Sequence, residues 1–425
     1  MPTATASTFN SQATKSVGSS SRTKPELRVL QVFSVLGVGG AETWLMALLK
    51  YFRERNEELP VTVKFDILLT GGEKSVFDDD AAALGAKIFY VPYRREKLGA
   101  FVRDFRQVLS LGRYDALHDH QDTNAGLHFL FGVGLLPPIR IAHFHNAFEA
   151  YPRGIIRKAN FYLGRRLVGN FASHISGTAL AVLDQYGVRV SASRLPIRDS
   201  VHCGFEVSSF KGNHRNVHSE LCDEFGWNDD VKIILFAGRL EKRKNPHFAL
   251  EVASECIRRR PEVRLLMAGA GEEIHRTLEA QIRALRLERQ IRLLGSRSDI
   301  ARLMLGSNVF LFPSLAEGLG MVLAEAQASG LPILASDSTP LESVVIPEIV
   351  RFLSLSEGPA SWATEVLRLI DQDRPDVSKC NNAVQGSAFS IEASASRLVQ
   401  MYGDRRSDLD QDKLRLFPQP SSGRP

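Results

Sequence analysis

Apolar residues recur along this chain in two alternating patterns, short continuous runs and longer stretches with a helical period. The runs are rich in β-branched and aromatic residues, which is typical of buried strands, and the periodic stretches between them predict helices. In the first half the expected strands are 27–34, 61–69, 87–92, 115–120 and 139–146, and the expected helices are 44–52, 73–85 and 98–111. Repeated strand–helix units of this kind predict a doubly wound α/β fold with a parallel sheet.

A polar stretch, residues 206–230, interrupts this alternation and is interpreted as a linker followed by an entry helix. A second series follows, with expected strands at 232–237, 263–268, 291–294 and 308–312 and expected helices at 246–259, after Asp299 and at 320–329. The 425 residues are enough for two domains of roughly 200 residues each. We therefore expect two parallel-sheet domains.

Composition limits the class of protein. The hydrophobic and charged fractions, 44% and 24%, are those of an ordinary soluble globular protein, and the net charge of +5 is a mild excess. The four cysteines are scattered without metal-ligand spacing, which favours a reducing cytoplasm over a disulfide framework. No apolar stretch reaches the ~18–20 residues of a spanning helix, and the polar segments 1–24 and 404–425 predict disordered tails.

A glycine turn follows the first expected strand, with Gly39 and Gly40 just before a helix. In such a turn, backbone N–H groups can approach a phosphate without interference from a Cβ atom. The dinucleotide-binding pattern G-x-G-x-x-G is absent, because its third glycine would fall at Glu42. A tight strand-to-helix turn without any ligand explains the glycines at least as well.

Two cations lie at a similar turn in the second half. Arg239 and Lys244 follow the strand 232–237 and precede a helix that begins near Pro246. Cations beside the free N–H groups of a helix can clamp a diphosphate, with the arginine bidentate and the lysine a point charge.

The stretch 312–332 carries two carboxylates, Glu317 in a glycine-rich loop and Glu325 in the helix that follows. Ionised carboxylates at the carboxyl edge of a parallel sheet are well placed to accept hydrogen bonds from hydroxyl groups. An alternative of equal weight is that Glu317 is an ordinary surface residue and Glu325 an ordinary helical residue, in a strand–helix connection that binds no ligand.

Histidines alternate at the ends of two expected strands, His118 with His120 and His143 with His145. Alternation places each pair on one face of the sheet. A metal site is disfavoured because no carboxylate or thiolate set lies at ligand spacing, whereas a neutral imidazole can bind an acceptor hydroxyl or relay its proton. Solvent-facing positions for at least two of these histidines stay open as an alternative.

Arginine and lysine are concentrated at 153–166, among aliphatic and aromatic residues. Such a segment can lie on an anionic membrane surface or collect phosphates, and the solvated basic face of a packed helix is an equal alternative. Nucleic acid is a less plausible partner, because no recognised nucleic-acid-binding module accompanies the charge.

Taken together, these residues resemble the family 4 retaining glycosyltransferases, which have the GT-B fold. The resemblance covers about residues 27–402 and rests on segments that occur in the family's order, namely 39–42, 238–246, 269–272, 294–297, and 317–325 with 329–332 after it. The His-x-His strand ends, with Arg140–Asn146, look most like members that build bacterial capsule or exopolysaccharide.

The resemblance implies two Rossmann-like doubly wound domains that face each other across a cleft. It divides the chain into an acceptor-binding domain at 25–205, a nucleotide-sugar-binding domain at 206–388 and a helix at 389–403 that crosses back to the first domain. It implies no metal and no cofactor, because cations and helix dipoles would stabilise the charge of the leaving nucleotide.

The resemblance also implies roles for individual residues. The residues expected to bind the donor are Gly39, Gly40, Gly238, Arg239, Lys244, Gly269, Gly295, Glu317, Gly318, Leu319, Gly320, Met321 and Glu325. Those expected to act in catalysis are His145, Arg239, Lys244 and Glu317. Those expected to bind the acceptor are His118, His120, His143, His145 and Asn146.

The implied function is retaining transfer of a hexose-type sugar from a UDP- or GDP-linked donor to a saccharide or lipid-linked saccharide in polysaccharide biosynthesis. The expected place is the cytoplasm, with peripheral contact at the inner face of the plasma membrane. A nucleotide-sugar epimerase of the same plan and a non-catalytic sugar-nucleotide-binding subunit are the alternatives. Two segments depart from the family pattern, 337–342 where many members have a Gly-Gly pair, and 202–206 in the linker.

Overall fold

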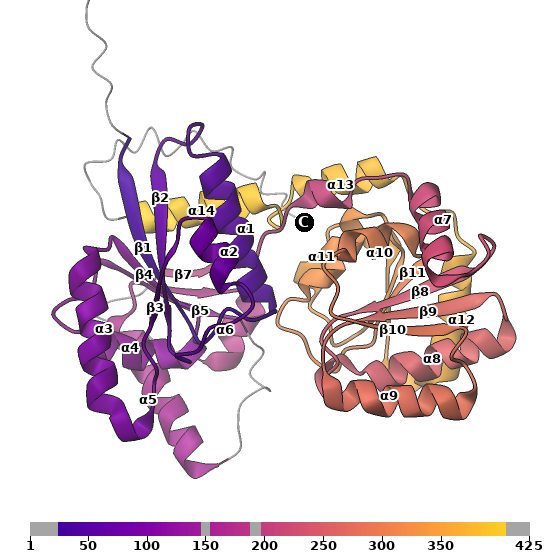
Figure 1. Ribbon diagram of the computed structural model, residues 1–425, viewed down its shortest axis with the longest axis horizontal. Coiled ribbons are helices and arrows are strands. Elements are labelled where there is room, and N and C mark those ends of the chain that lie inside the picture. The colour runs from indigo at the N-terminus through magenta and orange to yellow at the C-terminus, as the bar shows by residue number, and fades with distance from the viewer. Residues whose placement is uncertain (1–23, 146–153, 188–196, 405–425) are drawn as a thin grey trace, which may run out of the picture.

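The computed structural model describes residues 24–145, 154–187 and 197–404, which form two parallel-sheet domains side by side (Figure 1). The first sheet has seven strands in the order β3-β2-β1-β4-β5-β6-β7, and the second has six in the order β10-β9-β8-β11-β12-β13. The strand pairs of both sheets are parallel. The predicted fold class is therefore confirmed.

The strands of the first sheet are β1 (Glu26–Phe33), β2 (Thr62–Leu69), β3 (Lys87–Tyr90), β4 (Ala116–Asp119), β5 (Ile139–Phe144), β6 (His174–Gly177) and β7 (Ile197–Ser200). The helices of that half are α1 (Gly40–Glu54), α2 (Asp78–Ala83), α3 (Leu98–Gly112), α4 (Ala125–Phe131), α5 (Ile155–Phe171) and α6 (Leu180–Tyr186).

The strands of the second sheet are β8 (Lys232–Ala237), β9 (Val263–Ala268), β10 (Ile291–Gly295), β11 (Val309–Phe312), β12 (Ile333–Ser336) and β13 (Val350–Leu353). The helices of that half are α7 (His214–Phe225), α8 (Pro246–Arg259), α9 (Glu272–Leu285), α10 (Ile300–Gly306), α11 (Met321–Ala328), α12 (Gly358–Ile370), α13 (Val377–Gln385) and α14 (Ile391–Gly403).

The central strands of both sheets are buried along almost their whole length. In β8 every residue after Lys232 is buried, and β11 is buried at each position. Parallel strands with helices on both faces read as continuous apolar runs, and this is why the hydrophobic pattern located them.

The expected helix 73–85 is wrong in its first part, because α2 begins only at Asp78. The amide of Phe77 donates to the carbonyl of Leu36, so the preceding residues are held against the loop after β1. The expected strand 139–146 ends at Phe144, and Asn146 lies outside the described residues, as do 1–23 and 405–425 of the expected tails.

The last helix, α14, lies beside α1 in the first domain, where it is drawn in yellow (Figure 1). The indole N–H of Trp44 donates to the hydroxyl of Ser394 at 2.8 Å, and Tyr402 is buried in the same core. The two connections between the domains run together, because Phe205 and Phe389 are joined by a backbone hydrogen bond of 3.0 Å. No helix within the described ranges is long and apolar enough to cross a bilayer.

Candidate active site

Lys244 and Glu317 form the central pair of the candidate site. The Lys244 ammonium donates to both carboxylate oxygens of Glu317, at 2.7 and 2.8 Å, although the residues are 73 positions apart. Their side chains are only 14% and 4% exposed, and the Lys244 nitrogen lies 5.3 Å from the centre of the Phe312 ring. An ammonium has three N–H donors and a carboxylate about four acceptor positions, so both groups keep capacity for a ligand.

Three glycine turns at the carboxyl ends of β8, β9 and β10 stack on one another. The amide of Gly238 donates to the carbonyl of Ala268, and the amide of Gly269 donates to the carbonyl of Gly295. A Cβ atom on Gly269 would overlap the carbonyl oxygen of Gly238, so only glycine fits at this contact. Together, the stacked turns form one continuous surface at the carboxyl edge of the sheet, and the exposed Arg239 lies next to it.

The loop after β11 is fixed on the Lys244 segment, because the amide of Leu315 donates to the carbonyl of Arg243 at 2.8 Å. Gly320 then takes a left-handed conformation, φ +79°, which lets α11 begin at Met321. The buried residues Gly318 and Leu319 complete the loop.

Glu325 lies in the middle of α11 and is half-buried. Burial raises the pKa of its carboxyl to about 7. Within the described part of the chain, its carboxylate has no hydrogen-bond or ion-pair partner. A partly buried carboxyl group with unused acceptor positions is suited to accept hydrogen bonds from ligand hydroxyls.

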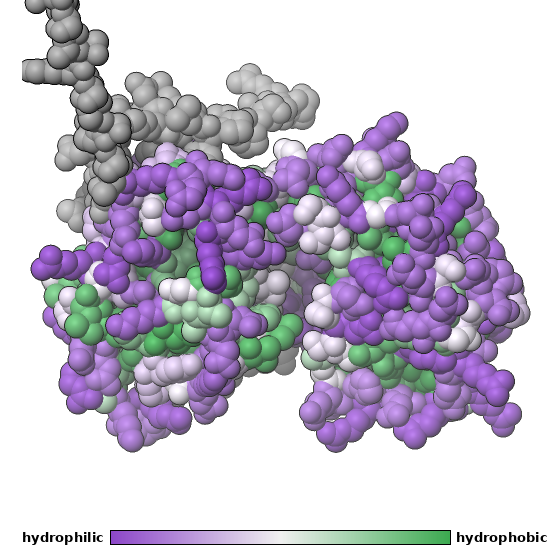
Figure 2. Space-filling view, turned by 45° about the horizontal axis from the view of Figure 1, so that its top comes forward, coloured by the Kyte–Doolittle hydropathy of each residue, from purple (hydrophilic) through white to green (hydrophobic). Residues whose placement is uncertain are grey.

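In the first domain, Gly39 is the N-cap of α1 and Gly40 is its first residue. The carboxylate of Glu42 folds back over Gly39, so that a Cβ atom there would meet its oxygen. Burial raises the pKa of Glu42, while its own backbone N–H and the Arg239 guanidinium oppose the rise. Glu42 and Arg239 therefore lie within electrostatic reach of each other across the crevice between the domains, which Figure 2 shows from one side.

Sequence reasoning used Glu42 as part of the 39–42 segment of the family resemblance and as a mismatch to a dinucleotide pattern, but did not name it as a site residue. The available signal was its place in the first turn of the helix after the glycine pair. A carboxylate there occupies the position where helix N–H groups attract an anion.

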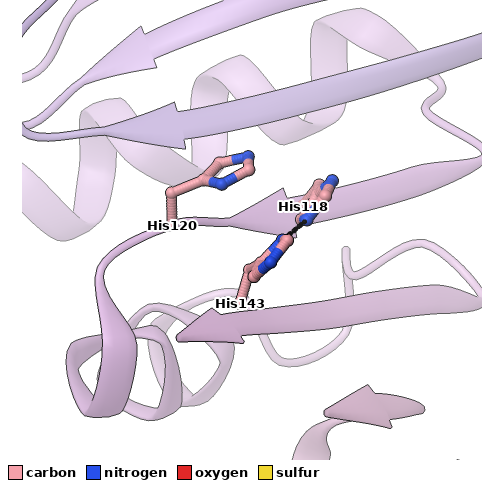
Figure 3. Close-up of side chains that lie close together, drawn as sticks. All are labelled: His118, His120 and His143. Carbon is pink, nitrogen blue, oxygen red and sulfur yellow. Dashed lines mark hydrogen bonds between the residues drawn. The ribbon is translucent and has the colours of Figure 1, made fainter. Parts of the chain in front are cut away.

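The histidines at the ends of β4 and β5 form one cluster around Trp44. Figure 3 shows His118 on β4, His120 just after the end of that strand and His143 on the neighbouring β5, with a hydrogen bond between His118 and His143. The ring centres of these three and of His145 lie 5.4–6.3 Å from that of Trp44. His118, His120 and His143 are 1%, 9% and 0% exposed, so solvent-facing positions for these three are wrong, because α1 and α14 cover this face.

The amide of Gln31 fixes the direction of the hydrogen bonds through the cluster. Its oxygen accepts from His120 Nε2 at 2.7 Å and its nitrogen donates to the Tyr402 hydroxyl at 3.1 Å. Tyr402 is then free to donate its own proton to His118 Nδ1, at 2.8 Å. In this direction His118 donates from Nε2 to His143 Nδ1 at 3.0 Å. His143 Nε2 is buried with no partner within hydrogen-bond distance among the described residues, and the nearby backbone of Val201 raises the pKa of His143.

The same direction holds on the other side of Gln31. Because His120 donates from Nε2, its Nδ1 accepts from His145 Nε2 at 2.8 Å. The Nδ1 of His145 is then left as an acceptor, with the Cys203 thiol 3.8 Å away. With the protons running in this direction, all four imidazoles are neutral Nε2–H tautomers. Burial is the main cause that lowers the pKa of each, and it lowers that of His145 to about 3.

His118, His120 and His143 are also the residues that could hold a metal ion, since one nitrogen of each lies within 4.8 Å of the others. Most of their nitrogens already bond to one another, to Gln31 or to Tyr402. A metal would have to replace several of these hydrogen bonds. The donor set therefore fits a hydrogen-bond chain better than a metal centre.

The basic segment expected at 153–166 falls mainly on α5, and Arg153 lies outside the described residues. Tyr162 and Leu163 are 58% and 48% exposed on this helix. Lys158 and Arg166 are exposed with them.

Solved structures with the same arrangement define the fold. The crystal structure of Anabaena HepE in complex with UDP-glucose matches with a TM-score of 0.72 and 17% identity, over 89% of this chain and 100% of that one. WaaG, a glycosyltransferase involved in lipopolysaccharide biosynthesis, matches with a TM-score of 0.66 and 14% identity, over 88% and 99%. At this identity the likeness shows the fold, which is GT-B.

Sequence relatives define the family. EpsF of Bacillus subtilis (strain 168), named as a glycosyltransferase, is 30% identical over 383 residues, which are 88% of this chain and 96% of EpsF. The D-inositol 3-phosphate glycosyltransferase of Corynebacterium urealyticum is 31% identical over 181 residues, 40% of this chain and 43% of that protein. The family described as Glycosyl transferases group 1 matches residues 219–386. The chain belongs to this family and is a glycosyltransferase.

Proposed function

We propose that this glycosyltransferase is a retaining, metal-independent enzyme of family 4 that transfers a hexose-type sugar from a UDP- or GDP-linked donor. The observation that carries the proposal is the nearly buried Lys244–Glu317 pair at the carboxyl edge of the second sheet. Open parallel sheets bind ligands at this edge, where helix N-termini attract phosphates.

The donor diphosphate would lie between Arg239, Lys244 and the N–H groups after Gly39 and Gly40. Arg239 is exposed and lies near the end of β8, so its guanidinium can reach a ligand in the crevice. The cations would stabilise the negative charge that develops on the leaving nucleotide, the task a metal performs in other transferases. Glu42 would move away from Gly39 as the diphosphate takes its place.

The carboxylates would bind the sugar and the ribose. Glu317 is held by Lys244 and would accept hydrogen bonds from hydroxyls of the transferred sugar, next to the backbone of Gly318 to Met321. Glu325 would accept from the ribose hydroxyls, which supply the partners that its carboxylate lacks among the described residues. HepE, a neighbour in fold, was solved with UDP-glucose, and this supports a nucleotide-sugar donor.

The acceptor would bind on the side of the first domain. His145 is half-buried at the end of β5, and its Nδ1 is the acceptor nitrogen at one end of the histidine chain. The Nδ1 atom of His145 would accept a hydrogen bond from the incoming hydroxyl, while His118, His120 and His143 would fix the position of the His145 ring. Retention would follow from attack on the same face as the departing nucleotide, with the donor phosphate as the base.

The acceptor class that we propose is a saccharide or lipid-linked saccharide in capsule or exopolysaccharide synthesis in the cytoplasm. The exposed Tyr162 and Leu163 beside Lys158 and Arg166 support peripheral contact with an anionic membrane. Neutralising Lys158 and Arg166 should reduce co-sedimentation with anionic vesicles and leave transfer to a soluble acceptor intact. Equal co-sedimentation of the neutralised variant would reject the membrane contact.

The stereochemical outcome tests the proposed reaction. Proton NMR of the first product formed should show the anomeric configuration of the donor sugar, both with and without EDTA. Glu317→Gln should slow turnover by orders of magnitude. An inverted product, or activity that EDTA abolishes and divalent ions restore, would reject the proposed mechanism.

A further inference from the structure

A cavity of about 370 Å³ lies at the amino edge of the second sheet. It is lined by Lys232, the first residue of β8, and by Asn308 and Pro332, which directly precede β11 and β12. Lys244 and Glu317 follow the carboxyl ends of β8 and β11. The cavity and the candidate active site are therefore on opposite edges of the same sheet.

The lining of this cavity is strongly basic. Its basic members are His214, Arg215, His218, Lys232 and Arg374, and its single acid is Asp229. The hydroxyl of Ser219 donates to Asp229, with its oxygen 3.0 and 3.1 Å from the two carboxylate oxygens. Among the described residues, no ion pair joins any of the five basic side chains to an acid.

The positive charge is crowded and partly shielded from water. Burial lowers the pKa of His214, and Arg374, Arg215 and His218 lower it further. The Arg374 amino groups donate to the carbonyls that end α10 and α11, but its buried Nε–H has no partner within the described residues. An unused buried donor costs stability unless a ligand compensates it.

We propose that this cavity binds a small anion that carries a phosphate or diphosphate group. Arg215 and Lys232 are the side chains free to meet it, since neither forms a side-chain hydrogen bond or ion pair in the described structure. Guanidinium and ammonium groups are the usual phosphate ligands of proteins. The site is independent of the proposed donor site, because it shares no residue with it.

Calorimetric titration of the whole chain with inorganic pyrophosphate tests the site. The chain should carry Arg239→Ala and Lys244→Ala, so that binding in the crevice is removed. Pyrophosphate should still bind, and adding Arg215→Ala with Lys232→Ala should weaken it at least tenfold. Adding Lys379→Ala instead, an exposed lysine of α13 outside the cavity, should leave the affinity unchanged.

Two results would overturn the site. One is loss of all pyrophosphate binding on removal of Arg239 and Lys244 alone, and the other is unchanged affinity after removal of Arg215 and Lys232. Melting curves check that each variant is folded. Arg215→Ala alone, at an exposed position of α7, is the second variant if the double change unfolds the chain.

Discussion

At the scale of residues, the Lys244–Glu317 pair holds two opposite charges almost out of contact with water. Lys244→Ala would leave the Glu317 carboxylate buried without its counter-charge, a change that costs about 3–5 kcal/mol in comparable pairs. We expect a lower midpoint of urea denaturation for this variant, and partial recovery in Lys244→Ala with Glu317→Ala. Equal or greater destabilisation of the double variant would contradict the pairing.

The direction of the histidine chain gives a spectroscopic prediction. Nitrogen-15 NMR of histidine-labelled protein should show His118, His120, His143 and His145 as neutral Nε2–H tautomers at pH 7.5–8. Gln31→Leu removes the group that links the two halves, and the His120 signals should then change most. Nδ1–H tautomers in the unaltered protein would show that the chain runs the opposite way.

The same histidines predict how stability depends on pH. Burial lowers their pKa values in the folded protein, so below the ordinary histidine value of about 6.5 the unfolded chain binds more protons. The contribution of these neutral histidines to the free energy of unfolding is complete above about pH 6.5 and is lost as the pH falls below that value. The melting temperature should therefore drop between pH 7 and 5, and less steeply for His143→Gln.

Glu325 acts in the opposite sense, because burial raises its carboxyl pKa to about 7. Its cost to stability grows as pH rises from about 4.5 to 7. Melting curves of Glu325→Gln, which lacks this titration, separate the two effects. If the melting temperature of Glu325→Gln stays constant from pH 7 to 5, this result would contradict a buried, neutral histidine cluster.

At the scale of elements, the stacked glycine turns at the ends of β8, β9 and β10 form the backbone surface of the proposed donor site. Gly269→Ala would place a methyl group against the carbonyl of Gly238, and overpacking of this kind costs about 1–3 kcal/mol. Gly40→Ala meets no atom within 4 Å, so it should leave the melting temperature unchanged and reduce turnover by crowding the donor phosphate. Loss of stability in Gly40→Ala, or full activity, would count against this role.

The sequence predicted most central strands because they are continuous apolar runs between periodic helices. It did not locate β6, β7, β12 and β13. β6 and β7 each have a single large apolar residue, an isoleucine, among polar residues and glycine, so they carry no apolar run. It placed the start of α2 too early, since the tertiary hydrogen bond from Phe77 to Leu36 outweighs local helix propensity there.

Several residues of the candidate site could be named from the sequence, whereas the contacts between them could not. Arg239, Lys244, Glu317 and Glu325 follow from motifs on single turns. The Lys244–Glu317 bond and the bond from Tyr402 to His118 join residues 73 and 284 positions apart, and only the folded chain reveals such contacts. The boundaries of the domain division and the roles of the site residues stay predictions.

At the scale of the whole molecule, the two domains meet through paired connections and through α14, which begins just after the second connection and packs on α1. Glu42 on the first domain and Arg239 on the second lie within electrostatic reach of each other across the crevice. A donor that replaced Glu42 beside Arg239 would contact both domains at once. Donor binding should therefore stabilise the chain as a unit.

Melting temperatures of the whole chain with UDP-, GDP- and ADP-glucose, each in EDTA, test most directly whether the Lys244–Glu317 pair marks the donor site. A ligand at a hundred times its Kd adds about 2.7 kcal/mol to the free energy of unfolding. We expect a shift with a UDP- or GDP-linked sugar, unchanged by EDTA, absent in Lys244→Ala and retained in Lys379→Ala. No shift with any of these sugars, or a full shift in Lys244→Ala, would contradict the proposed donor site.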